Sequence, residues 1–265
     1  MSFRGALGII RLQVATRFAY PFEFWARLVT TPMYVAVFAF LWLTVYQHSP
    51  SATIGGLTAG QMVAYYILVE ISVQLITMQE VIWQMGKEVR KGRIDVELIK
   101  PISYWGGHLA HRLGDKVAFG AIMVVPFFAV AILVFGAPVP DALTLGAYAV
   151  VVLLGMLLSF FMCAALAALV VPLGHEFGGM TLLWILEGLL GGIIMPLQLY
   201  PGWFQSIAMA SPFQYTIYTP AMIWLGRMPV TAQLLMGMLA WTAVSFVIAW
   251  TAWRLVLRKM TVQGG

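Results

Sequence analysis

The sequence predicts an all-α membrane protein with six transmembrane helices, and composition is the first reason. Of the 265 residues, 62% are hydrophobic and 9% are charged, against roughly 45–50% and about 25% in soluble domains. A soluble domain of this size needs many polar side chains to cover its surface, and this chain has too few of them. The same composition excludes a disordered chain. Cys163 is the single cysteine, so a disulfide scaffold is excluded as well.

Six apolar runs are long enough to be membrane spans, since a helix needs roughly 20 residues to cross about 30 Å of hydrocarbon. The runs are residues 24–46, 62–85, 117–135, 143–171, 180–199 and 232–256. We therefore expect one polytopic domain that covers residues 1–265.

The basic residues predict the orientation of these spans. Of the fifteen Lys and Arg, three precede the first span, seven lie between the second and third, and three lie at the end of the sixth. With Arg27 at the edge of the first span, only Arg227 falls on the opposite side. Cytoplasmic segments keep such an excess, so both termini are predicted to be cytoplasmic. The pI of about 9.4 then reflects this bias and attraction to anionic lipids, and indicates no nucleic-acid partner.

Residues 1–21 are predicted to form an amphipathic helix on the cytoplasmic membrane surface. Apolar residues recur there at three- and four-residue steps, namely Phe3, Leu7, Ile10, Val14 and Phe18. An ordinary cytoplasmic lead-in is the alternative. No cleavable signal peptide is evident, because arginines interrupt the apolar residues.

Residues 86–116 form the strongly polar stretch of the chain. A connection needs only about five residues, so this length predicts a short helix that contacts another molecule through Ile94, Val96, Leu98 and Ile99. Pro101 would end that helix. The alternative is a charged run that only fixes the topology.

Residues 196–229 are apolar but cannot form one helix, because five prolines interrupt them. Aromatic residues typical of a membrane interface accompany the prolines. We expect short re-entrant helices in the outer leaflet, buried by protein or lining a cavity. A plain interfacial loop is the alternative.

The order of these parts resembles the permease subunits of ABC-2-type exporters over nearly the whole chain. The shared features are the surface helix, six spans, the polar loop GRIDVELIKPIS, and the proline-rich segment with its SPF sequence. The pattern of Gly92, Asp95, Leu98, Lys100 and Pro101 is most similar to the branch that pairs two different permeases with one ATPase.

The resemblance implies a plasma-membrane (prokaryotic inner-membrane) subunit that forms a dimer with an identical or homologous permease and binds ABC ATPase subunits. It places a coupling helix within residues 86–116 and an outer gate in the proline-rich segment. The coupling candidates are Arg90, Gly92, Arg93, Asp95, Leu98, Lys100 and Pro101, with His175 and Glu176 in the short turn of residues 172–178. The gate candidates are Pro196, Pro201, Trp203, Phe204, Pro212 and Phe213.

No catalytic or nucleotide-binding motif is evident in the sequence. The nearest approach to G-x4-G-K-[ST] is Gly86-Lys87-Glu88, so ATP and Mg²⁺ are expected in the partner ATPase and no cofactor in this chain. His175-Glu176 begins H-E-x-x-H, but Gly179 replaces the second histidine. His108 and His111 are interpreted as solvated side chains. The protein is therefore not expected to be an enzyme.

Glu70, Glu80 and Glu187 lie within predicted spans, where a charge is costly and usually faces a cavity or a partner. Gln74 is one helical turn from Glu70 and shares its face. Two hypotheses remain open. In the first, Glu70, Gln74 and Glu187 line a cavity that favours cationic amphiphiles. In the second, they only form hydrogen bonds that hold neighbouring helices together.

Export of amphiphilic molecules, such as drugs, antibiotics or dyes, is the favoured function. Lipid or glycolipid export is the alternative within the same family. An ATP-independent secondary transporter or channel is the alternative class, although such transporters often show paired broken helices in two internal repeats. Here only one end of the chain is broken by prolines.

Overall fold

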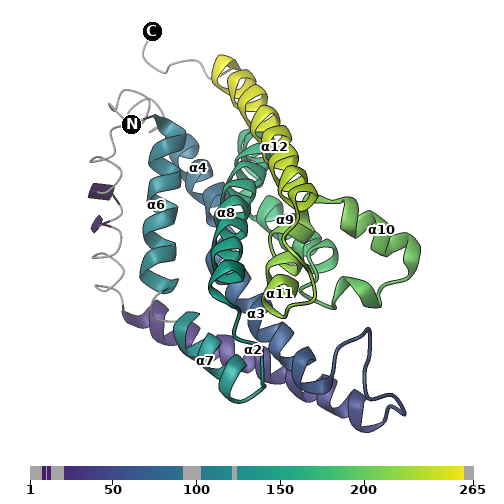
Figure 1. Ribbon diagram of the computed structural model, residues 1–265. Coiled ribbons are helices and arrows are strands. Elements are labelled where there is room, and N and C mark those ends of the chain that lie inside the picture. Colours follow the sequence, from purple (N-terminus) through teal and green to yellow (C-terminus); the bar gives the residue numbers. More distant parts are fainter. Residues whose placement is uncertain (1–7, 10, 13–20, 92–102, 121–123, 260–265) are drawn as a thin grey trace.

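The computed structural model describes residues 8–9, 11–12, 21–91, 103–120 and 124–259 (Figure 1). Helices dominate this part of the chain, and no strand occurs within it. The elements are α2 (Pro21–Gln47), α3 (Ala59–Ile76), α4 (Glu80–Arg90), α6 (Tyr104–Phe119), α7 (Val125–Leu133), α8 (Ala142–Val170), η2 (Val171–Leu173), α9 (Glu176–Leu190), η3 (Leu197–Leu199), α10 (Gly202–Ala210), η4 (Pro212–Tyr215), α11 (Tyr218–Trp224) and α12 (Ala232–Lys259). The all-α prediction is confirmed for these residues.

Within the described part of the chain, four helical segments are long and apolar enough to cross a membrane. They are Val29–Gln47, Ala59–Arg90, Ala142–Leu173 and Ala232–Val256, and they match the first, second, fourth and sixth predicted spans. The third and fifth predicted spans fall on α6 with α7 and on α9, so the count of six stays a prediction. Most of the predicted surface helix lies outside the described residues.

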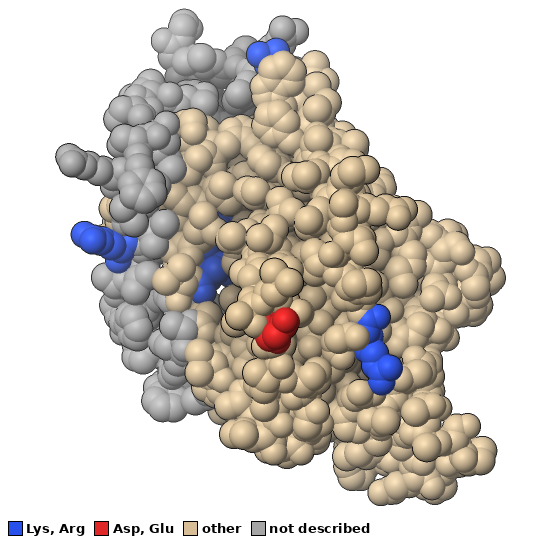
Figure 2. All heavy atoms as spheres, viewed as in Figure 1, with Lys and Arg blue, Asp and Glu red and all other residues tan. Residues whose placement is uncertain are grey.

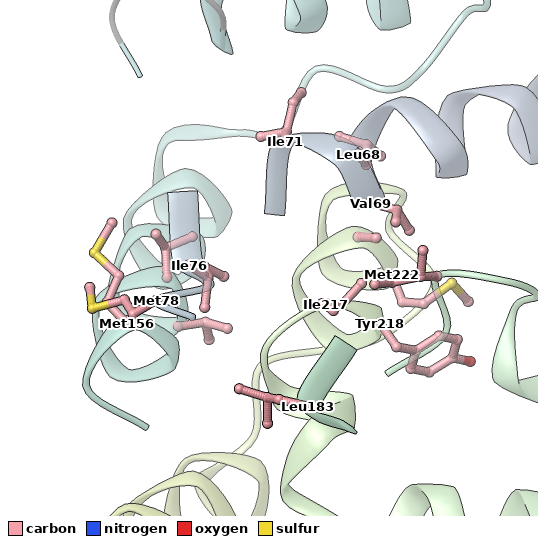
Figure 3. Close-up of a cluster of buried hydrophobic side chains, with 14 of the residues drawn as sticks. Leu68, Val69, Ile71, Ile76, Met78, Met156, Leu183, Ile217, Tyr218 and Met222 are labelled. Atoms are coloured by element: carbon pink, nitrogen blue, oxygen red, sulfur yellow. The ribbon is translucent and has the colours of Figure 1, made fainter. Parts of the chain in front are cut away.

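Helix α3 forms the centre of the bundle. It is apolar on every side, and most of its residues are buried against α2, α7, α8 and α11. Figure 3 shows Leu68, Val69 and Ile71 of α3 in a cluster with side chains of α8, α9 and α11. A helix of this kind belongs in a protein interior.

The outer helices carry the opposite pattern. Helices α2 and α12 leave many large apolar side chains exposed, including Phe40 at 76% and Met236 at 65%. Figure 2 shows isolated charged side chains among the described residues of one face, which are otherwise uncharged. A large exposed apolar surface fits contact with lipid.

Helices α8 and α12 pack along each other (Figure 1), where Trp253 Nε1 donates to the Ala164 carbonyl at 3.0 Å.

The second predicted span, 62–85, is not one continuous helix. Helix α3 ends at Ile76, Thr77 is extended (φ −69°, ψ 141°), and α4 begins at Glu80. The Met78 N–H donates to Ser159 Oγ of α8 at 3.0 Å. The Ser159 hydroxyl thus accepts the hydrogen bond that a helical carbonyl would otherwise accept. Such a replacement is needed because hydrocarbon contains no water to satisfy the N–H group.

The fifth predicted span, 180–199, also ends early as a helix. Helix α9 stops at Leu190, and the chain then runs without regular structure to η3. Tyr65 Oη donates to the Gly192 carbonyl at 2.7 Å, and Tyr66 Oη donates to the Ile194 carbonyl at 2.9 Å. These α3 tyrosines supply donors to carbonyls of the irregular backbone that follows α9.

We predict that Gly192→Ala destabilises the protein by about 3 kcal/mol. Gly192 has φ +87°, where a side chain costs roughly 1–2 kcal/mol, and its Cβ would lie 2.6 Å from Tyr65 Oη. The free energy of unfolding in a dodecyl sulfate titration measures this loss. Gly56→Ala is the control, because Gly56 has φ +78° with open space around it, so about 1 kcal/mol is expected. Equal losses would contradict the close packing of Gly192.

Candidate functional site

The end of α4 is locked to the start of α9 by an ion pair. Arg90 Nη1 contacts Glu176 Oε1, whose side chain is only 6% exposed. Glu176 lies in the first turn of α9, where the helix dipole stabilises a carboxylate. A Cβ on Gly86 would overlap the Glu176 side chain. The structure therefore brings together two coupling candidates that are 86 positions apart in the sequence.

A second polar contact joins α4 to α6. Glu88 Oε2 accepts a hydrogen bond from Tyr104 Oη at 3.1 Å and lies 3.1 Å from His108 Nε2. Arg112 Nη2 donates to Gln84 Oε1 at 2.7 Å. The interpretation of His108 as solvated is wrong, because its side chain is only 5% exposed between the two helices. No group of three metal-ligating side chains occurs among the described residues.

The remaining coupling candidates are placed only in part. Gly92, Arg93, Asp95, Leu98, Lys100 and Pro101 lie outside the described residues. His175 is exposed at the N-cap of α9, next to Glu176. The predicted polar loop 86–116 is shorter than expected, since α4 continues to Arg90 and α6 starts at Tyr104. Its role in coupling stays a prediction.

The acids inside the bundle are hydrogen-bonded to glutamines. Gln74 Nε2 donates to Glu70 Oε1 at 2.7 Å within α3, and Lys116 Nζ of α6 donates to the Gln74 carbonyl at 2.8 Å. Gln79 Nε2, in the break between α3 and α4, donates to Glu187 Oε2 of α9. Glu187 is only 2% exposed. These bonds connect α3, α6 and α9 through polar groups.

The cavity beside Glu70 is too small for an amphiphile. It has a volume of about 10 Å³ and is lined by Thr31, Glu70, Ile71, Gln74, Val124 and Phe127. This is about the space of one water molecule. The cargo-binding role of Glu70, Gln74 and Glu187 therefore stays a prediction. Within one chain, Glu187 bonds Gln79 in the break before α4, and the side chains of Glu70 and Gln74 bond each other within α3.

The proline-rich segment is broken, as predicted, into η3, α10, η4 and α11. Pro196 and Pro201 occupy the N-caps of η3 and α10, and Pro212 begins η4. Trp203 is 69% exposed on α10, and its ring centroid lies 5.4 Å from that of Phe204. Phe213 is partly buried against the core. The structure thus separates the gate candidates between an exposed helix and the interior, and their gating role stays a prediction.

Sequence reasoning missed several residues that the structure places at these contacts. Gln79 could have been noticed as a polar side chain inside an apolar run, and Lys116 as a cation directly before one. Gly86 and Ser159 carry no such signal, because small residues are common in membrane helices. Their importance depends on Glu176 and Met78, which are distant in the sequence.

We predict that Gln79→Met destabilises the protein by about 2 kcal/mol, because it leaves the buried Glu187 carboxyl without its donor. Glu187→Met in the same chain should recover most of this loss, since two apolar side chains need no hydrogen bond. Thermal unfolding in detergent measures both effects. Gln233→Met, at an exposed position of α12, serves as the control. A double variant no more stable than Gln79→Met would contradict the pairing.

Comparison with known proteins assigns a family to this architecture. The family described as "ABC-2 family transporter protein" matches residues 33–264, nearly the whole chain. No curated protein and no solved structure matches. The match includes α3, α4 and α9 and the proline-rich segment.

Proposed function

Because the chain belongs to the ABC-2 family of transporter proteins, we propose that it is the permease subunit of an ATP-driven exporter of amphiphilic molecules, such as drugs, antibiotics or dyes. ATP is bound and hydrolysed with Mg²⁺ in a separate ATPase subunit. The pathway forms between this chain and a second permease, identical or homologous, in the plasma membrane. The termini and the α4–α6 connection face the cytoplasm.

The observation that carries the proposal is the Arg90–Glu176 contact. Residues 91–103 connect α4 to α6, and an ATPase that binds this connection pulls on the end of α4. The ion pair and the close fit of Gly86 against Glu176 transfer that movement to α9. Helix α9 leads directly into the irregular backbone after Leu190 and into the proline-rich segment. A movement at one end of the bundle therefore reaches the gate candidates at the other.

The apolar interior, which contains few acidic side chains, supports this class of cargo. Apolar side chains with few acids suit molecules that combine an apolar body with a cationic group. The cavity of about 10 Å³ beside Glu70 is too small for such a molecule, and this supports a pathway between two permeases. Lipid or glycolipid export uses the same machinery with different cargo, and an ATP-independent transporter would need no partner ATPase.

Affinity purification of the tagged chain from its own membranes in mild detergent tests this function. We expect an ABC ATPase to co-purify, and to be lost from the Arg93→Glu, Asp95→Arg double variant. An ATPase that binds both chains would show that these two residues are not the docking residues. A chain that purifies alone would favour the ATP-independent alternative.

We predict that Arg90→Glu lowers dye efflux at least tenfold in cells that carry the variant in place of the wild type. The substitution places a second carboxylate beside the buried carboxylate of Glu176 and removes its cation, so the contact between α4 and α9 becomes repulsive. Arg90→Glu with Glu176→Arg should recover efflux, because the swapped charges attract again. Lys91→Glu makes the same charge change at the neighbouring exposed residue and should have little effect. Failure of the swapped pair to exceed Arg90→Glu would contradict the coupling role.

We predict that Glu70→Gln and Glu187→Gln each lower the efflux of a cationic dye more than the efflux of a neutral dye. The difference should be about fivefold, which corresponds to the loss of about 1 kcal/mol of attraction for the cation. The carboxylate attracts the cation, whereas glutamine keeps the shape of the side chain. Asp141→Asn removes a carboxylate at an exposed helix end and is the control. Equal losses for both dyes would show that these acids only form hydrogen bonds within the bundle and do not contact the cargo.

A further inference from the structure

A groove of about 400 Å³ lies at the end of the bundle opposite Arg90 and Glu176. Its apolar lining includes Leu143 and Ala147 of α8, Ile223 of α11, and Met228 in the following turn. Thr144 and Arg227 supply polar groups. The volume falls in the range of small-molecule sites, roughly 300–1,000 Å³.

The groove lies at one end of the candidate membrane spans, where lipid headgroups are expected. Three candidate membrane spans begin at this end, at Ala59, Ala142 and Ala232. The groove lies beside the first turns of α8 and the segment that leads into α12. Leu143 on its rim is 81% exposed, as a side chain in contact with acyl chains would be. An occupant would thus have one end in the membrane and the other at its surface.

Arg227 gives the groove its charge. The segments that connect the spans at this end, residues 48–58, 134–141 and 225–231, are all described and contain two charged residues, Asp141 and Arg227. Hydrogen bonds from the side chain and backbone N–H of Thr144 lower the pKa of Asp141, and its carboxylate caps α8. Arg227 is therefore the cation available to an anionic group at this end.

The Arg227 side chain is held in place by α3. Its Nη2 donates to Gln61 Oε1 at 2.7 Å, and the same oxygen accepts from the Thr58 N–H at 3.2 Å. Gln61 is fixed because it also belongs to the capping box at the start of α3. This leaves further guanidinium N–H groups for a ligand, and a planar fork suits phosphate oxygens.

From the groove, its place at the end of the candidate spans and the fixed guanidinium, we infer that this end of the chain binds a membrane phospholipid, with the phosphate on Arg227 and an acyl chain along Ala147, Ile223 and Met228. The site is separate from the Arg90–Glu176 contact and does not rest on the coupling proposal. Its occupant is a resident lipid that joins α8, α11 and the start of α12.

Native mass spectrometry of the full-length chain in detergent, titrated with phosphatidylglycerol, tests the inference. We expect one lipid to bind more tightly than the rest, and Arg227→Gln to weaken it about tenfold. Arg227→Lys should keep most of the affinity, and Ala147→Phe should weaken binding by filling the groove. Arg254→Gln removes a cation that stacks on Trp250 at the far end of α12 and should leave this lipid unaffected.

Two further ligands separate the possible sources of the anion. Diacylglycerol, which has the same acyl chains without phosphate, should bind weakly and without dependence on Arg227. Inorganic phosphate should not displace the lipid at equal concentration. Unchanged affinity in Arg227→Gln or Ala147→Phe would overturn the site, and displacement by inorganic phosphate would reassign it to a free anion.

Discussion

Backbone hydrogen bonds must be satisfied inside hydrocarbon, where no water is available, and this constraint shapes the centre of the molecule. Among the described residues, the chain leaves helical geometry inside two predicted spans that contain buried backbone, at Thr77 and after Leu190. Each interruption is covered by side chains of other helices, Ser159 in the first case and Tyr65 with Tyr66 in the second. Helix α3 takes part in both arrangements, because it supplies the two tyrosines and ends at the first interruption.

The two interruptions also connect distant parts of the chain. Gln79 lies in the first and bonds Glu187 of α9, and α9 leads into the second. Trp42 of α2 donates to Tyr66 Oη at 2.8 Å and extends the contacts to the outer helices. Polar groups in this bundle therefore specify which helices meet, while apolar side chains fill the space between them.

Composition and charge predicted the helical class and the membrane character, because both depend on properties summed over many residues. The interruption at Thr77 was not predictable, since Thr-Met-Gln contains neither proline nor glycine and the break depends on a hydroxyl 81 positions away. In the proline-rich segment the breaks were predictable, because proline removes a backbone donor wherever it stands. Arg90 and Glu176 were predicted as coupling residues in two different cytoplasmic segments, and only the fold shows that they contact each other.

The close fit between Gly86 and Glu176 has a consequence for the evolution of the family. In the conformation that pairs Glu176 with Arg90, position 86 has no room for a methyl group. The two positions should therefore change together. Relatives with alanine or serine at the first are expected to carry a shorter residue, such as aspartate, at the second. A cation at position 90 should be retained wherever the acid is retained.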